Sequence, residues 1–204
     1  MSSYTYEFEN RKTPLETYEW DNVWFEHTEN ETDDRVMYIG DSISCATRKV
    51  ATATSESKLL FDGFGTSKAL DNPYFIDSVR IFARQQGKRR AILLNNGLHG
   101  WHLDDKTEYA EEYEKFVKFL LDEFKGTPII LLLTTHVIDA ARDKRVVARN
   151  EVVAEIAAKY SLPTVDLYSL TENDGLISAD GVHLTPDGYK LLAKEVVDAV
   201  LANS

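Results

Sequence analysis

Short apolar runs separated by stretches of helical spacing constrain the fold of this chain more than any other sequence feature. Buried parallel strands appear as continuous apolar runs, whereas amphipathic helices carry apolar residues every three or four positions. Because strands that alternate with helices form βαβ units, we expect a parallel sheet covered by helices on both faces. Apolar runs predict strands over 36–39, 91–94, 128–133 and 162–167, with a weaker candidate over 58–64.

Helix signals fill the intervals between these strands. The clearest is the last, where Thr185 is a suitable N-cap and Pro186 a suitable first helical residue. Residues 51–57 are predicted to form a surface loop, as is the charged stretch 139–145. The predicted helices lie over 43–50, from Asn72 and Pro73 onward, over 109–124, over 152–160 and from Pro186 to about Leu201.

Length and composition indicate one main domain preceded by a distinct segment. The 204 residues, of which 43% are hydrophobic, are enough for one sizeable core. We divide the chain into an N-terminal aromatic arm or hairpin over 1–34 and a main domain over 35–204. The aromatic residues of the arm either stack on a substrate or form an edge strand or dimer contact, and we favour the second interpretation. A homo-oligomer therefore stays open.

The charge balance argues against nucleic acid as a partner. The chain has 23 basic and 34 acidic residues, a net charge of −11, whereas nucleic-acid affinity needs clustered Lys and Arg. No apolar run approaches the ~20 residues of a membrane helix, so we expect no membrane partner. The single cysteine, Cys45, excludes an intrachain disulfide, and residues 1–10 lack the pattern of a signal peptide. We expect a cytoplasmic protein, with an exported protein whose signal has been trimmed as the alternative.

A serine follows the first predicted central strand and is the candidate nucleophile. Gly40, Asp41 and Ser42 come directly after the apolar run, at the strand end where α/β folds place their chemistry. A serine needs a base at neutral pH, and the base needs a partner that fixes its tautomer. His183 is the candidate base and Asp180, three residues earlier, its candidate partner. We expect Asp41 to cap the backbone rather than to react.

These two ends of the chain resemble the SGNH, or GDSL, hydrolase superfamily. The residues that carry the resemblance are Gly40-Asp41-Ser42-Ile43 and Asp180-Gly181-Val182-His183, with Gly97-Leu98-His99-Gly100 at the place of a third family block. In order and spacing the resemblance covers about residues 35–201. It implies an α/β fold, namely a three-layer α/β/α sandwich with a flavodoxin-like parallel sheet of about five strands.

The resemblance also implies the chemistry of a serine esterase without a cofactor. Ser42 would attack an acyl carbonyl, His183 would move the proton, and Asp180 would orient His183. The substrate would be a small-molecule or carbohydrate ester, with a short-chain or acetyl group.

The oxyanion hole that the resemblance implies consists of the N–H groups of Ser42 and Gly65 and the side chain of His99. His99 stands where the family has an asparagine, and a neutral imidazole can still donate one N–H. Gly63 is the rival of Gly65. Asn96 is the fallback side-chain donor in place of His99 and a candidate for binding the substrate. Trp101 is a candidate for stacking on a sugar.

Three other functions remain alternatives at this stage. An acyltransferase would use the same Ser42, and a non-enzymatic carbohydrate-binding module would keep only the fold. The altered third block is the reason to consider the binding module. A metal-dependent phosphoesterase is the third alternative, although none of its candidate ligands has strong metal-ligand spacing; they are His99, His102, His136, Asp180 and His183.

Overall fold

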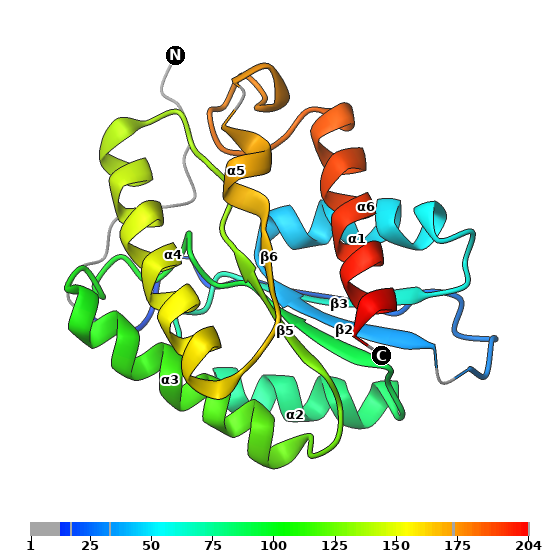
Figure 1. The fold of residues 1–204 in the computed structure, drawn as a ribbon. Helices are drawn as coiled ribbons and strands as arrows, with labels where there is room; N and C mark the ends of the chain where they lie inside the picture. Colours follow the sequence, from blue (N-terminus) through cyan, green and yellow to red (C-terminus); the bar gives the residue numbers. More distant parts are fainter. Residues whose placement is uncertain (1–12, 17, 33, 173, 204) are drawn as a thin grey trace.

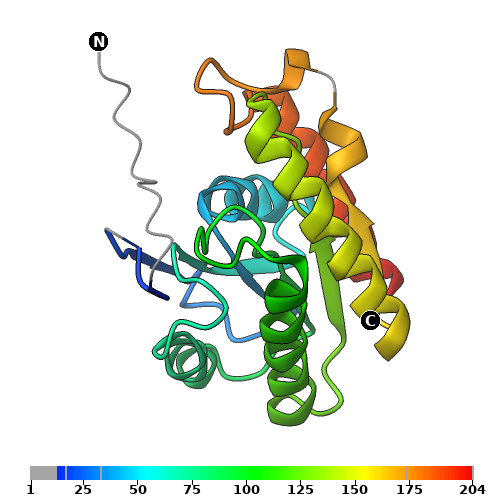
Figure 2. The same cartoon turned by 90° about the vertical axis from the view of Figure 1, so that its left-hand side faces the viewer.

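The computed structural model describes residues 13–16, 18–32, 34–172 and 174–203. Its centre is a single six-stranded sheet in the order β1-β3-β2-β4-β5-β6. All neighbouring strands are parallel except β1, which pairs antiparallel with β3 at one edge. Figure 2 shows β1, in dark blue, at that edge. The strands are β1 (Asp21–Trp24), β2 (Arg35–Gly40), β3 (Leu60–Thr66), β4 (Ala91–Leu94), β5 (Ile129–Leu133) and β6 (Thr164–Asp166).

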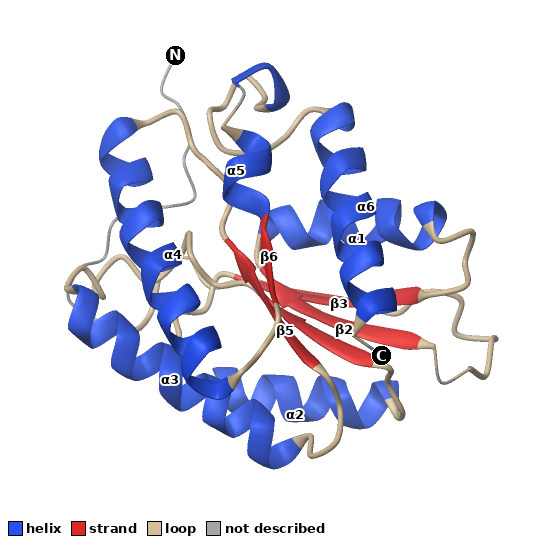
Figure 3. Cartoon of the chain, in the orientation of Figure 1, coloured by secondary structure: helices blue, strands red, loops and turns tan. Residues whose placement is uncertain are grey.

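Helices cover both faces of this sheet, as the apolar pattern predicts. One core contains residues of α2, α3 and α4, and the other contains residues of α1, α5 and α6. Figure 3 shows the strands between these layers, and α1 lies beside α6 (Figure 1). The helices are α1 (Ser42–Thr54), α2 (Phe75–Gln86), α3 (Lys106–Glu123), α4 (Ala140–Tyr160), α5 (Leu167–Thr171) and α6 (Pro186–Ala202), with a 3₁₀ turn, η1 (Asp174–Leu176).

This architecture is the predicted three-layer α/β/α sandwich. The five parallel strands run β3-β2-β4-β5-β6, which is the flavodoxin-like order with its reversal between β2 and β4. In such a sheet the strand ends beside the reversal form a crevice for ligands. The carboxyl ends of β2 and β4 lie at this reversal, where Ile39 pairs with Leu94.

Most predicted elements are confirmed, and α4 is the main correction. The stretch 139–145 is helical from Ala140 rather than a loop. Asp139 caps this helix by accepting the N–H of Arg142 at 2.9 Å. The first turns are mostly exposed or half-buried, so they lack the apolar period by which a helix is recognised.

The described part of segment 1–34 contributes the strand β1. All four of its residues are exposed, and it pairs with β3 rather than with another strand of the same segment. The sheet thereby gains a sixth, antiparallel strand beyond the expected five. Across the described residues, every helix is too short or too polar to traverse a lipid bilayer.

Candidate active site

Ser42 is held where β2 meets α1. Its position as the first residue of α1 follows from the N-cap, since Asp41 accepts the N–H of Ile43 at 2.8 Å. A tight approach of strand and helix requires Gly40, where a Cβ would lie 2.7 Å from that of Ser44. The first N–H groups of a helix have no partner within it and carry its positive end. The Ser42 hydroxyl therefore lies beside backbone donors suited to a developing negative charge.

The structure brings Ser42, His183 and Asp180 into one hydrogen-bonded line. His183 Nε2 lies 2.8 Å from Ser42 Oγ, and His183 Nδ1 lies 2.7 Å from Asp180 Oδ2. A carboxylate oxygen can only accept, so the ring donates through Nδ1–H and leaves Nε2 to accept the serine hydroxyl. Residues 141 positions apart thus meet in the arrangement by which an imidazole activates a hydroxyl group.

The loop that carries this pair keeps the Asp180 carboxylate ionised. Burial opposes ionisation, but the pKa of Asp180 lies well below its ordinary value because several donors bind the charged form. Oδ1 accepts the N–H groups of Val182 and His183 at 3.0 and 2.9 Å and the hydroxyl of Ser178 at 2.9 Å. The same bonds fix the direction in which Oδ2 faces the imidazole.

Asp41 acts as a cap, as predicted, rather than as part of this line. Its side chain is buried, and burial raises its pKa despite the N–H of Ile43 and the nearby His183. Cys45, one turn further along α1, is half-buried and free, and burial raises its pKa as well. A cysteine that is held in the thiol form is not activated for attack.

Gly65 does not have the position expected of an oxyanion donor. It lies inside β3, paired with Gly40 on one side and Asn22 on the other. Alternate residues of a strand direct their N–H groups to opposite neighbours. The N–H of Leu60 donates to Asp34, before β2, and the N–H of Ser67 donates to Trp20, before β1.

Gly65 therefore directs its N–H toward β1 and away from Ser42. Gly63 lies two residues before Gly65 on the same strand, so its N–H points in the same direction. The same geometry therefore argues against Gly63 as an oxyanion donor. A side chain is excluded at Gly65 for another reason, since a Cβ there would lie 2.1 Å from Cys45 Sγ. The expected role of Gly65 is thus corrected: this glycine allows α1 to pack on the sheet.

His99 lies in the loop after β4 with its side chain 7% exposed. Burial, followed by the charge of Arg149, lowers the pKa of His99 to about 4, so the ring is neutral at neutral pH. The indole of Trp20 packs edge-on against the imidazole at 5.9 Å between ring centroids. A Cβ on Gly65 would lie 3.7 Å from the same indole and 3.4 Å from Asp41 O. The indole of Trp20 therefore lies between His99 and Gly65 of β3.

The buried guanidinium of Arg149 shapes this loop. Nη1 donates to the carbonyl oxygens of Gly97 and His99 at 3.1 and 2.6 Å, and Nη2 donates to those of Gly100 and Leu103 at 2.7 and 3.1 Å. Burial lowers the pKa of Arg149 to about 10, which leaves it charged at neutral pH. A single charged side chain on α4 thus holds the peptide that presents His99.

Asn96 and Trp101, the two residues predicted to bind the substrate, are both buried against other parts of the protein. Asn96 is buried, and its amide donates to Lys68 O at 3.0 Å, joining the loops after β3 and β4. Trp101 is 4% exposed, with the guanidinium carbons of Arg145 and Arg142 over its ring at 4.4 and 5.1 Å. These positions do not fit the expected roles in substrate binding and sugar stacking, because the side chains are already enclosed.

The remaining candidate histidines pair with separate acids. His102 Nε2 lies 2.8 Å from Asp71, and His136 Nδ1 lies 2.7 Å from Asp143. Within the described part of the chain, no three His, Cys, Asp or Glu side chains are gathered as a metal site would require.

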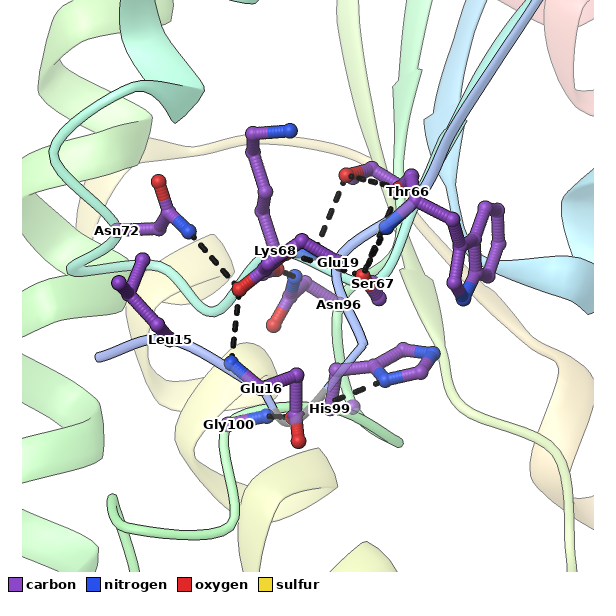
Figure 4. A network of polar contacts seen from close by, with 12 residues as sticks. Leu15, Glu16, Glu19, Thr66, Ser67, Lys68, Asn72, Asn96, His99 and Gly100 are labelled. Carbon is purple, nitrogen blue, oxygen red and sulfur yellow. Dashed lines mark hydrogen bonds and ion pairs between the residues drawn. The ribbon is translucent and has the colours of Figure 1, made fainter. Parts of the chain in front are cut away.

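Sequence reasoning missed the contribution of the N-terminal segment to this site. Glu16 accepts the N–H of Gly100 at 3.0 Å, and its Oε1 lies 3.9 Å from His99 Nδ1. Glu19 secures the segment by accepting the N–H of Glu16 at 2.8 Å and the Ser67 hydroxyl at 3.0 Å (Figure 4). The aromatic pattern of residues 1–34 indicated an edge strand, but nothing in it indicated a carboxylate beside His99.

The fold defines a class of proteins, the three-layer α/β/α sandwiches with a flavodoxin-like parallel sheet, and several solved structures share it. A lipase/acylhydrolase from Enterococcus faecalis superposes with a TM-score of 0.63 at 18% identity, over 82% of this chain and 95% of that one. A GDSL-family lipolytic protein from Veillonella parvula gives 0.62 at 22% identity, over 80% and 96%. The W215I form of Axe2, an acetyl xylan esterase from Geobacillus stearothermophilus, gives 0.58 at 16% identity, over 81% and 94%.

This chain has the fold of the SGNH, or GDSL, hydrolase superfamily, as the resemblance implied. No protein-family model matches the sequence, and no curated protein does. At these identities the likeness shows the fold alone, and the function has to be argued from the side chains.

Proposed function

We propose that this protein is a serine ester hydrolase that acts on short-chain, chiefly acetyl, esters through an acyl-enzyme intermediate. The observation that carries the proposal is the line from Ser42 Oγ through His183 to Asp180, with contacts of 2.8 and 2.7 Å. The presence of two acetyl xylan esterases among the structural neighbours supports the choice of acetyl esters and of a carbohydrate as the alcohol component.

The reaction begins with attack by Ser42 Oγ on the ester carbonyl while its proton passes to His183 Nε2. The imidazolium that forms donates to the Asp180 carboxylate. The carbonyl oxygen becomes an anion at the start of α1, where the N–H of Ser42 is available; a donor of this kind is typically worth ~10²–10³ in rate. His183 then protonates the leaving alcohol, and the same groups add water to the acyl-enzyme to release the acid.

The test compares wild type with Ser42→Ala on acetyl, butyryl and longer esters and on acetylated sugars. We expect the variant to lose hydrolysis of every ester, because Ser42 Oγ is the nucleophile that lies 2.8 Å from His183 Nε2. Ser44→Ala is the matched control, since Ser44 lies in the same helical turn but donates to Asp41 O at 2.7 Å.

A fluorophosphonate probe should label wild type and Ser44→Ala but not Ser42→Ala. Turnover retained by Ser42→Ala would refute the proposed serine mechanism. Transfer of the acetyl group to an added alcohol in preference to water would identify an acyltransferase instead.

A further inference from the structure

A groove open to solvent lies between the start of α3 and the first half of α4, two helices that pack side by side (Figure 1). Its volume is about 350 Å³, within the range of pockets for small ligands, and none of the residues that line it belongs to the line from Ser42 to Asp180. Basic side chains outnumber acidic ones in its walls, although the whole chain has a net charge of −11. The charged residues that line the groove are Asp104, Asp105, Lys106, Lys144, Arg145 and Arg149.

Both acids of the groove already have partners. Asp105 caps α3 by accepting the N–H groups of Thr107 and Glu108 at 2.7 and 3.2 Å. Asp104 Oδ1 accepts Nε and Nη2 of Arg145 at 2.9 and 2.6 Å. Their negative charges are therefore directed at the helix end and at Arg145, and neither forms a hydrogen bond to the other cations of the groove.

The guanidinium of Arg149, at the inner wall of the groove, carries a buried positive charge. Arg149 is 3% exposed, and its Nη1 and Nη2 donate to uncharged carbonyl oxygens. Nε has no hydrogen-bond partner within the described residues. The ring of Tyr109, which also lines the groove, lies 4.5 Å from the guanidinium carbon. Buried charges in proteins usually have an ion of opposite sign beside them, and the groove is open to such an ion.

Two further cations lie nearer the solvent. Lys144 is exposed, whereas the side chain of Arg145 is 15% exposed. Arg145 Nη1 is buried and has no hydrogen-bond partner among the described residues. Lys106, in the wall formed by α3, is already paired with Glu151 at 2.9 Å. An anion that enters the groove therefore meets Lys144 and Arg145 first and then the charge of Arg149.

We propose that this groove is a phosphate-binding site, in which a phosphate group lies between Lys144 and Arg145 and offsets the buried charge of Arg149. A phosphate group carries a charge of about −1.5 to −2 at pH 7 and matches the planar fork of arginine. A carboxylate carries a single charge, so several cations favour phosphate. The volume leaves room for a group attached to the phosphate, so the ligand is free phosphate or a phosphate monoester. The site does not depend on the proposed ester hydrolysis.

The first experiment measures the binding of inorganic phosphate by thermal denaturation at pH 7 and constant ionic strength. A ligand that binds only the folded protein raises Tm as its concentration increases. We expect phosphate to raise Tm more than sodium chloride does at the same ionic strength. An effect no larger than that of chloride would overturn the proposal.

Glucose 6-phosphate, with glucose as the neutral control, distinguishes the two sources of the phosphate group. Tighter binding than that of inorganic phosphate would identify a phosphate monoester as the ligand. Equal or weaker binding would identify free phosphate. Binding of glucose as tight as that of glucose 6-phosphate would contradict recognition of the phosphate group.

Variants that remove one charge locate the site. Arg145→Gln should raise the Kd for inorganic phosphate about tenfold or more, because a hydrogen bond to a charged group is lost. Lys144→Gln should raise it about two- to fivefold, because this charge is screened by solvent. Lys159→Gln is the matched control: it removes the same charge near the other end of α4, where Lys159 pairs with Glu114 at 2.9 Å. An unchanged Kd in Arg145→Gln, or equal effects of the two lysine variants, would refute the site.

An NMR titration of ¹⁵N-labelled wild type with inorganic phosphate keeps the proposal testable if Arg145→Gln does not fold. The backbone amide signals of residues 103–106 and 141–149 should shift and saturate together. Shifts centred on Ser42 and His183 instead would place the phosphate in the candidate active site and overturn the proposal.

Discussion

Replacement of Asp180 by asparagine tests the orientation of the base with little change in shape. The amide can keep its Oδ1 contacts with the N–H groups of Val182 and His183 and with the Ser178 hydroxyl. At the Oδ2 position an NH₂ group replaces an acceptor, so it donates to His183 Nδ1 instead of accepting from it. His183 would then carry its proton on Nε2, where it cannot accept the proton of Ser42.

The size of the effect follows from the charge and the exposure of the pair. Two unit charges about 4 Å apart attract by about 4 kcal/mol at an effective dielectric constant of 20 and by about 1 kcal/mol in water. The side chains of His183 and Asp180 are 43% and 52% exposed, so solvent screens the attraction and the value lies between these limits. Loss of the charge alone should therefore lower kcat by about 5- to 10³-fold. The wrong tautomer of His183 should lower it further. We expect Asp180→Asn to lower kcat by about 10²–10⁴.

The assay is initial-rate hydrolysis of a short-chain ester from pH 5 to pH 9, with KM and kcat determined separately. KM should change little, because Asp180 acts on the proton transfer rather than on substrate binding. Asp187→Asn is the control: this exposed acid in the first turn of α6 pairs with Lys190 and not with His183. A loss below threefold in Asp180→Asn, or an equal loss in the control, would refute the assignment of Asp180 as the orienting acid.

Two stability predictions follow from the loop after β4. Removal of the Arg149 guanidinium in Arg149→Met leaves four carbonyl oxygens without their donor, so we expect a loss of about 3–5 kcal/mol by thermal denaturation; an unchanged Tm would contradict this. The unfolded chain takes up a proton on His99 below pH 6.5, whereas the folded chain does so only near pH 4, so stability should fall by about 3 kcal/mol from pH 7 to pH 4. The free energy of unfolding in urea should depend less on pH in His99→Asn than in wild type. An equal pH dependence in the two proteins would refute the prediction.

Elements with a strong local signal could be predicted from the sequence. β4 and the start of α6 have the predicted bounds because an apolar run and a Thr-Pro start leave few alternatives. Ser42, Asp180 and His183 could be proposed together because a serine at the end of the first central strand is combined with an acid–histidine pair just before the final helix. The first turns of α4 could not, because their helix is stabilised by the Asp139 cap and by contacts rather than by an apolar period. The contact of Glu16 with the loop of His99 spans 84 positions, and no local pattern encodes a pairing of that range.

The N-terminal segment contacts both the edge of the sheet and the loop of His99. β1 pairs with the free edge of β3, the edge toward which Gly65 directs its N–H. The residues just before β1 place Glu16 and Trp20 against His99. A chain without this segment would leave the edge of β3 unpaired and the Nδ1 side of His99 open to solvent. One segment therefore both encloses the ring of His99 and pairs with the edge of the sheet.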